Sequence, residues 1–272
     1  MRHRGTLLNL VGWLVIVGPL GGCAASLAVR PTLPSAYRVD RPPLVFHTDF
    51  PLASQHRLLE EMIARRDDLG RLLGLPGSNE PIHVYLFEDA ARFEAFVRRY
   101  HPDFPDRRAF FLETDTRLVV YAQWGDRVAE DLRHEVTHAY LHAVVPNLPL
   151  WLDEGLAEYF ETPRGQRGLN GEHLQLLTAR LRHGDWVPDL ARLEALPESL
   201  DMSLADYAEA WAWTHLLLEG PPPGRAILQS FLQHLRQYGW AEPISTRLFQ
   251  ALPAPHQALV DHIRLAASSL RP

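Results

Sequence analysis

Two histidines and a glutamate in the stretch RHEVTHAYLH, residues 133–142, have the types and spacing of a metal site. His134 and His138 are four residues apart, so on a helix they share one face and can direct ring nitrogens at one cation. Glu135 stands beside them, where a carboxylate can take a proton from metal-activated water and pass it to a leaving amine. Because the chain contains 14 histidines, this pattern needs a third ligand to define a site.

The stretch WLDEGLAEYF, residues 151–160, supplies the candidate third ligand. Glu154 and Glu158 lie four apart on one face of a second predicted helix, after the two prolines Pro146 and Pro149. Glu154 would complete a His2Glu set and leave a fourth position open to water, which is the catalytic rather than the closed structural arrangement of Zn²⁺. In the alternative reading, these histidines and glutamates belong to solvated helix faces.

HExxH followed by W-x-x-E-G-x-A resembles the gluzincin metallopeptidases, and more narrowly the small peptidases with an aminopeptidase-like core. The resemblance implies that His134, His138 and Glu154 bind Zn²⁺ and that Glu135 is the catalytic base. It also implies that Glu158 orients the first histidine from the outer shell, where a carboxylate on the distal ring nitrogen fixes the tautomer. The thermolysin-like zincin core is the fold that this resemblance implies.

The stretch DYAEAWAWTHLLL places Tyr207, Trp211 and His215 at helical spacing. Tyr207 or His215 could donate a hydrogen bond to the oxyanion that develops in peptide hydrolysis, and the family resemblance favours Tyr207. The alternative is an aromatic core stripe with one buried histidine. His142, one turn beyond His138, is interpreted as a rim residue rather than a ligand.

The run TRLVVYAQ, residues 116–123, precedes the predicted metal helix. The resemblance implies a substrate-binding edge strand at this place, to which a peptide is added through main-chain hydrogen bonds. A buried core strand is the alternative. Asp126 is expected to cap the helix that follows.

The N-terminus has the composition of an export signal. Residues 1–22 combine an arginine-containing start with a short apolar run, and LGGC resembles a bacterial lipobox that ends at Cys23, the single cysteine. We expect a lipoprotein signal peptide over 1–22 and a lipid on Cys23 that attaches the protein to a membrane. The resemblance implies the bacterial cell envelope, at the outer membrane facing the periplasm; an ordinary cleaved signal is the alternative.

The remaining pattern predicts an α+β fold. A proline-rich tether is expected over 23–43 and one metallopeptidase domain over 44–272. In that domain, β-rich runs with helices between them give a mixed sheet with helices, followed by a mostly helical half, and the metal site lies between the two halves.

These observations predict a zinc peptidase that cleaves peptide or protein substrates with metal-activated water. One alternative is an envelope lipoprotein whose zinc-binding domain is a non-catalytic scaffold or binds a partner. Another is hydrolysis of an amide in cell-wall material by the same site. The net charge of −6 provides no broad basic surface, so we expect no nucleic-acid partner.

Overall fold

The folded part of the chain begins earlier than predicted. The computed structural model describes residues 30–197 and 202–269, and residues from Pro31 onward form one compact unit. Strand β1 (Tyr37–Arg41) lies within the predicted tether and pairs antiparallel with β2 (Leu44–Thr48). The flanking prolines suggested a tether, but YRVDR gains main-chain partners from β2. The predicted signal peptide, Cys23 and the first residues of the tether lie outside the described residues.

Five strands form one mixed sheet, which confirms the predicted α+β class. The other strands are β3 (Ile82–Phe87), β4 (Ala109–Thr114) and β5 (Arg117–Gln123). The spatial order is β1-β2-β3-β5-β4, with β2, β3 and β5 parallel and both outer strands antiparallel to their neighbours. Strands β4 and β5 form a hairpin, in which Thr114 pairs with Arg117 across a two-residue turn.

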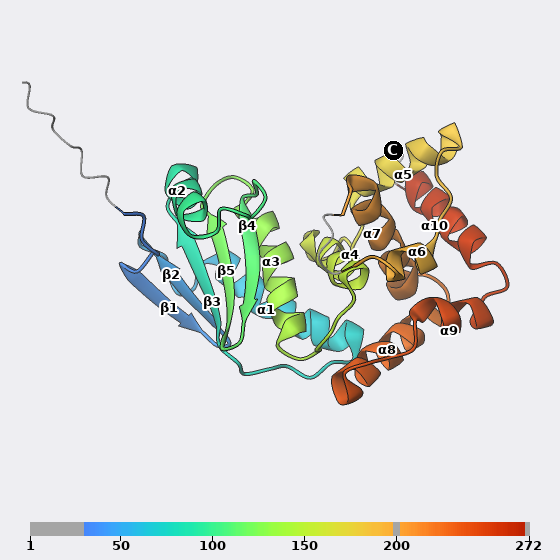
Figure 1. Ribbon diagram of the computed structural model, residues 1–272, viewed down its shortest axis with the longest axis horizontal. Helices are drawn as coiled ribbons and strands as arrows, with labels where there is room; N and C mark the ends of the chain where they lie inside the picture. Colours follow the sequence, from blue (N-terminus) through green and yellow to red (C-terminus); the bar gives the residue numbers. More distant parts are fainter. Residues whose placement is uncertain (1–29, 198–201, 270–272) are drawn as a thin grey trace, which may run out of the picture. The chain divides into compact units, whose positions relative to one another are not determined.

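Helices cover both faces of this sheet (Figure 1). The face that carries Val120 packs in one apolar core with α1 (Arg57–Leu73) and α3 (Val128–His142). The opposite face carries Tyr121 and packs an aromatic cluster against α2 (Ala90–Tyr100). Alternate residues of β5 therefore belong to different cores, as the two-residue period of a strand requires.

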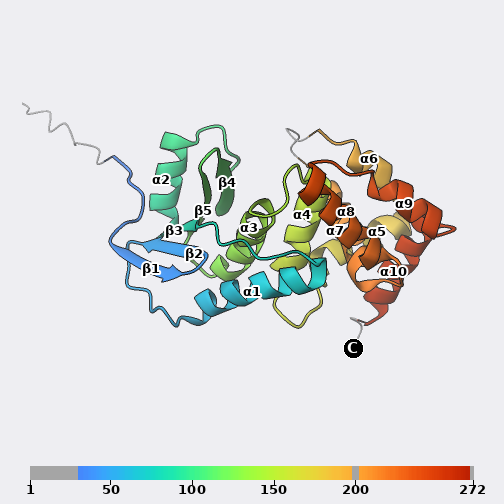
Figure 2. The same ribbon diagram turned by 90° about the horizontal axis from the view of Figure 1, so that it is seen from below.

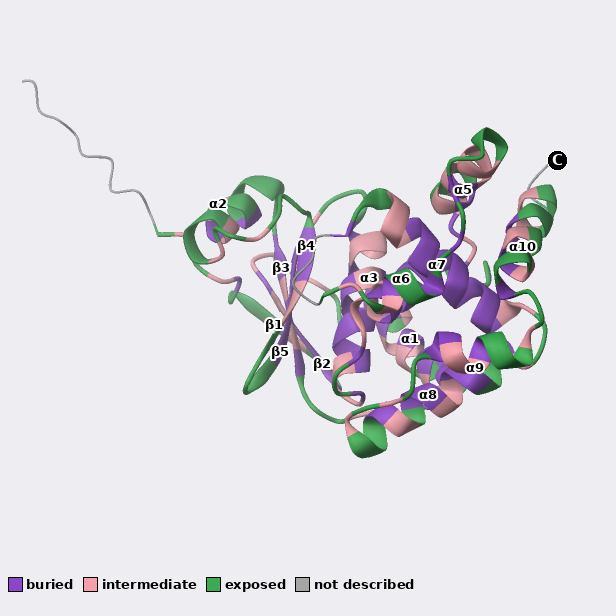
Figure 3. Ribbon diagram, turned by 45° about the vertical axis from the view of Figure 1, so that its right-hand side comes forward, coloured by how far each residue is buried: buried purple, intermediate pink, exposed green. Residues whose placement is uncertain are grey.

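The second half of the described chain is helical. Its elements are α4 (Leu150–Glu161), α5 (Gly171–His183), α6 (Leu190–Glu194), α7 (Leu204–Glu219), α8 (Gly224–Tyr238), α9 (Ile244–Ala251) and α10 (Pro255–Ser269). The sequence pattern predicted a mostly helical half, and these helices confirm it. Helix α7 is buried throughout residues 208–218, and Figure 3 shows it among the surrounding helices. Helix α1 extends from the sheet towards α8 (Figure 2), where Gln229 Nε2 donates to the Leu72 carbonyl at 3.0 Å.

Helix α3 begins differently from the prediction. Arg127, not Asp126, occupies the N-cap position, and its guanidinium pairs with Glu130. Because the first helical residue is Val128, the Asp126 side chain lies one residue too early to cap the helix. Glu130 and Asp131 are in the first turn, where the helix dipole favours negative charge.

Gly155 allows α4 to pack closely on α7. A Cβ atom at this position would lie 2.4 Å from Thr214 Oγ1 and 2.6 Å from the Ala210 carbonyl oxygen. Only a residue without a side chain permits this approach. The contact places the polar face of α4 at a fixed position beside α3.

Candidate metal centre

Three side chains from two helices converge at the predicted metal centre. Glu154 Oε2 of α4 lies 3.4 Å from His134 Nε2 and 3.7 Å from His138 Nε2 of α3. One ligand atom from each of these residues lies within 4.8 Å of the other two. Ligands bound tetrahedrally at about 2.1 Å stand roughly 3.4 Å apart, so this spacing matches a metal site.

The chemistry of the donor atoms also fits a cation. Glu154 Oε2 is buried and has no hydrogen-bond partner among residues 30–197 and 202–269. A buried carboxylate oxygen normally requires a compensating partner. A metal ion held by His134, His138 and Glu154 would provide that partner, so these residues could bind one.

Two cavities reach the metal centre. One, of about 490 Å³, is lined in part by His134 and Glu135, and the other, of about 280 Å³, by His138, Glu135 and Glu154. A bound ion would therefore be reachable by water and by a substrate. This accessibility is expected of a catalytic site and not of a closed structural one.

Glu135 lies on the wall of both cavities although its side chain is mostly buried. Burial raises its pKa above the ordinary value, the positive charges of His134 and His138 lower it, and the charge of Glu154 raises it again, leaving it raised. A carboxylate with a raised pKa accepts a proton more readily. Glu135 is therefore suited to the role of general base.

Glu161, and not Glu158, is the outer partner of the first histidine. His134 Nδ1 and Glu161 Oε2 are hydrogen-bonded at 3.1 Å. The carboxylate of Glu158 instead accepts from Asn170 Nδ2 at 3.2 Å and lies 2.8 Å from His173 Nε2. In this structure the outer hydrogen bond to His134 comes from Glu161, although a Glu158 carboxylate oxygen also lies within 4.8 Å of a His134 ring nitrogen.

The spacing of the glutamates along α4 explains why the sequence alone did not distinguish Glu158 from Glu161 as the partner of His134. Glu154, Glu158 and Glu161 follow the helical positions i, i+4 and i+7, so all three carboxylates share one face. Either of the last two could have reached the ring of His134. Glu158 contacts Asn170, which also caps α5, and His173 of α5. Glu161 is instead hydrogen-bonded to His134.

A chain of polar contacts leads from the second histidine towards the edge of the sheet. His138 Nδ1 lies 2.9 Å from Asp153 Oδ1, and Asp153 Oδ2 is hydrogen-bonded to His142 Nε2 at 3.0 Å. His142 Nδ1 is in turn 2.6 Å from Glu113 Oε2 on β4. His142 thus lies outside the group of His134, His138 and Glu154. With His138 and Asp153 it forms a second group whose ligand atoms lie within 4.8 Å of one another.

These hydrogen bonds and contacts determine the protonation of His142 and Asp153. Burial alone would lower the pKa of His142, but hydrogen bonds to Asp153 and Glu113 raise it to about 9. Burial alone would raise the pKa of Asp153, but its contacts with His138 and His142 hold it well below the usual range. Asp153 is therefore an anion between two imidazole rings.

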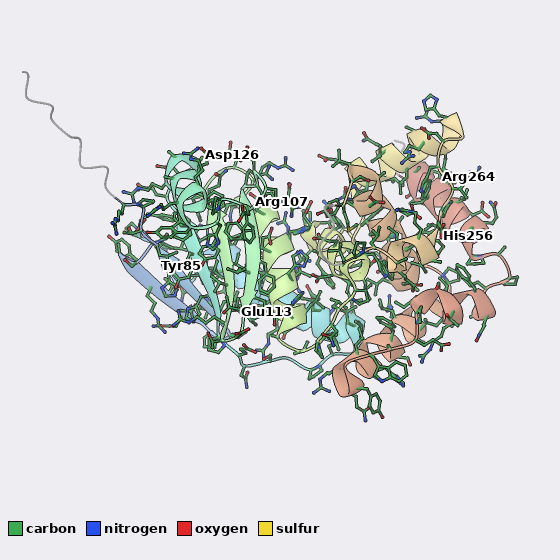
Figure 4. The ribbon with its side chains drawn as sticks, viewed as in Figure 1. Tyr85, Arg107, Glu113, Asp126, His256 and Arg264 are labelled. Carbon is green, nitrogen blue, oxygen red and sulfur yellow. The ribbon has the colours of Figure 1, made fainter. Side chains whose placement is uncertain are left out.

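Tyr207 lies at the site, and a residue that the sequence did not indicate lies with it. Arg107 Nη2 donates to the Tyr207 hydroxyl at 2.8 Å, and both side chains line both cavities with Glu135. Arg107 comes from the loop before β4, and no spacing rule connects it to the helix that carries His134 and His138. Figure 4 labels Arg107 and Glu113 near opposite ends of β4.

His215 is hydrogen-bonded to His262 at 2.7 Å, in the helical half of the unit.

The edge strand beside the site is β4, and not the predicted run 116–123. That run forms β5, which lies between β3 and β4. The alternative reading as a core strand is therefore the correct one for this segment. On β4, the Phe111 ring stacks 6.2 Å from that of His138, with 16° between the ring planes.

A comparison with protein-family models finds no match to this chain, and a comparison with curated proteins finds none either.

Within the described ranges, none of the helices combines the length and apolar character that crossing a membrane would require.

Proposed function

We propose that this protein is a zinc-dependent peptidase of the gluzincin type that hydrolyses peptide bonds. The observation that carries the proposal is Glu154 Oε2, which is buried without a hydrogen-bond partner in the described chain and faces the Nε2 atoms of both histidines. Glu135 lies beside this group on the wall of two cavities. A complete ligand set next to a candidate base favours a catalyst over a structural site.

Two histidines and one glutamate form a ligand set that suits zinc. A zinc ion bound by them would supply the Lewis acidity that polarises a carbonyl group and acidifies a water molecule. Glu161 and Asp153 would keep the two imidazole rings oriented from behind, because each carboxylate lies beside the Nδ1 atom of one ring.

Glu135 would move the proton. Its carboxylate takes a proton from the attacking water and delivers it to the nitrogen of the leaving amine. Its raised pKa, caused first by burial, supports the first step, since a stronger base removes the proton more easily.

Tyr207 and Arg107 would stabilise the charge that develops on the carbonyl oxygen. The Tyr207 hydroxyl accepts a hydrogen bond from Arg107, so its own proton remains available to a substrate oxygen. Burial and the charge of Glu154 raise the pKa of Tyr207, which keeps the hydroxyl protonated, and the guanidinium of Arg107 opposes this rise and so strengthens the hydroxyl as a donor. One such donor contributes about 10²-fold or more to the rate in acyl-transfer enzymes.

The outer edge of β4 would bind the substrate backbone. β4 ends the sheet on the side of α3, and Phe111 on this strand stacks with the ring of His138. A peptide added to this edge would form main-chain hydrogen bonds and pass close to the metal centre. This arrangement of the sheet, α3 and α4 supports a thermolysin-like zincin core.

Substitution of Glu135 by glutamine tests the proposal. The zinc-loaded E135Q variant should bind one zinc per chain and lose hydrolysis of a casein or peptide-library substrate. Wild-type hydrolysis should be abolished by a chelator and restored by zinc. The matched control is E80Q, at an exposed loop position, which should retain wild-type activity. Full hydrolysis by E135Q would remove the proposed base.

The same measurements separate the alternatives. Zinc binding without hydrolysis of peptides or cell-wall material by the wild-type protein would support a zinc-binding scaffold. Cleavage of peptidoglycan with no cleavage of casein or library peptides would assign the same site to cell-wall peptide.

We also propose that a lipid on Cys23 anchors the protein in the bacterial envelope, at the outer membrane facing the periplasm. The LGGC stretch after an apolar run supports this proposal. Labelling with a palmitate analogue should mark the wild-type chain and not C23S. Equal labelling of the two chains would contradict the anchor.

A further inference from the structure

A cavity lined by arginines lies apart from the metal centre. Its volume is about 610 Å³, larger than the two cavities of about 490 and 280 Å³ beside the metal ligands. It forms where the loop after α4 meets α1 and the junction of α7 and α8, and the described residues that line it differ from those of the other two cavities. The arginines are Arg65, Arg71, Arg164, Arg167 and Arg225.

The charge of this arginine cavity is opposite to that of the chain. Five arginines face only two carboxylates, Asp68 and Glu219, whereas the whole chain carries a net charge of −6. A surplus of positive charge in a concave surface concentrates anions there. General basicity of the protein does not explain such a surplus.

Asp68 and Glu219 hold the guanidinium groups in place without neutralising them. Asp68 accepts two hydrogen bonds from Arg164, at 2.6 and 3.0 Å, and one from Arg71 at 2.7 Å. Glu219 accepts from Arg167 Nε at 2.8 Å. A guanidinium has five N–H donors, so these contacts leave further donors for a ligand. The side chains of Arg71 and Arg164 also remain solvent-accessible, with exposures of 68% and 47%.

The loop that presents Arg167 is constrained. Arg167 has a backbone φ of 52°, in the left-handed region that non-glycine residues rarely adopt. The next residue, Gly168, is fixed by a hydrogen bond of 2.8 Å from Trp211 Nε1 to its carbonyl. A Cβ on Gly168 would lie 2.0 Å from the Tyr159 ring. Tight packing thus holds the loop in a conformation that directs Arg167 to the wall of the cavity.

Arg65 contributes a buried charge to the cavity lining. It is only 4% exposed, and its Nη2 donates to the Thr162 carbonyl at 3.1 Å and to Glu61 Oε1 at 3.5 Å. Its Nε finds no hydrogen-bond partner within the described part of the chain. A buried guanidinium with an incomplete set of partners is stabilised when an anion binds nearby.

We propose that the arginine cavity binds a multivalent organic phosphate, either free in solution or as the headgroup of a lipid. Arginine forks match phosphate oxygens, and several forks around one cavity favour a ligand with more than one negative charge. The volume exceeds the need of inorganic phosphate and lies in the range of small-molecule sites. Leu72, Tyr159 and Phe160 supply apolar walls for the organic part of the ligand.

Calorimetric titration with pyrophosphate tests the site. The protein is freed of metal, and the ionic strength is kept constant, because pyrophosphate chelates metals and salt screens charge. The wild type should bind one pyrophosphate, and R164Q/R167Q should bind it about tenfold or more weakly. R71Q/R225Q is the second variant, in case loss of Arg164 and Arg167 disturbs the loop, and it should also bind more weakly.

The matched control is R98Q/R264Q, which removes two exposed arginines that also pair with carboxylates on their own helices. It should bind pyrophosphate like the wild type. Sedimentation with phosphatidylcholine vesicles containing phosphatidic acid identifies the source: co-sedimentation that requires the cavity arginines indicates a lipid headgroup, and pyrophosphate binding alone indicates a soluble ligand. No pyrophosphate binding by the wild type, or equal weakening in the control, would overturn the proposal.

Discussion

Asp153 Oδ1 lies 2.9 Å from His138 Nδ1, the ring nitrogen opposite the one that faces Glu154. A carboxylate at this place fixes the tautomer of the ring and makes its Nε2 atom a stronger metal ligand. Since Asp153 directly precedes Glu154 in α4, one turn of one helix provides both a ligand and the support of another ligand.

Removal of the Asp153 charge should weaken metal binding. D153N keeps the shape of the side chain, and we expect its zinc affinity to fall by about 10-fold to 100-fold. Competition with a chromogenic chelator measures this change. D126N, at an exposed position that caps no helix, is the control and should bind zinc like the wild type. Unchanged affinity in D153N would show that Asp153 does not support His138.

The two outer glutamates of α4 should behave differently. E161Q weakens the hydrogen bond to His134 and should lower zinc affinity by about 10-fold. E158Q changes contacts with Asn170 and His173, so its effect on zinc affinity should be smaller. The same chelator competition ranks the two variants. The reverse order would restore Glu158 as the outer partner of His134.

Loss of the Tyr207 hydroxyl should slow hydrolysis if the proposed function holds. Y207F should reduce kcat by about 10²-fold or more, because one donor to the developing oxyanion is removed. Zinc content should be unchanged, since Tyr207 is not a metal ligand. A zinc-loaded Y207F with the kcat of the wild type would assign the tyrosine to packing alone.

Folding stability should fall in acid because of His215. Burial and the neighbouring His262 lower the pKa of His215 to about 4, below the ordinary value of 6.5. A proton therefore binds His215 more tightly in the unfolded chain than in the folded one. The contribution of neutral His215 to folding stability is complete above pH 6.5, and it is lost as the pH falls towards 4. From pH 7 to pH 5 this contribution should fall by about 2 kcal/mol.

Urea unfolding of the wild type and H215N at both pH values isolates this effect. Other titrating groups contribute to both proteins, so the change in their stability difference reports His215. A stability difference that does not change with pH would contradict the lowered pKa.

A methyl group at residue 155 should separate α4 from α7. G155A places a Cβ 2.4 Å from Thr214 Oγ1, and overpacking of this kind costs about 1–3 kcal/mol of unfolding free energy. G171A is the matched control, because no atom lies within 4 Å of a Cβ at that position. Equal stability of the two variants would indicate that the helices can shift without cost.

Local sequence patterns predicted much of the fold and the group of side chains that could hold a metal ion. The spacing of His134 and His138 depends on the helical period alone, and Glu154 follows on the next predicted helix. The β-rich runs of the first half likewise predicted strands of a mixed sheet. Strand β1 was not predicted, because the stretch YRVDR between prolines has no clear strand pattern. It is a strand because it pairs with β2.

The order of the strands and the partners of the carboxylates required the tertiary structure. Whether β4 or β5 lies at the edge depends on pairing between segments, and both share the same local character. Likewise, Glu158 and Glu161 occupy the same face of α4, and the choice between them depends on Asn170 and His173 of another segment.

The sequence by itself determined which residues could bind a metal, because ligand type and helical spacing are local properties. Only the tertiary structure decided what surrounds them: the Arg107–Tyr207 pair, the Asp153–His142 contact and the arginine cavity. These arrangements bring together side chains up to 160 positions apart, from Arg65 to Arg225. Their proximity follows from the packing of whole helices, which no short stretch of sequence specifies.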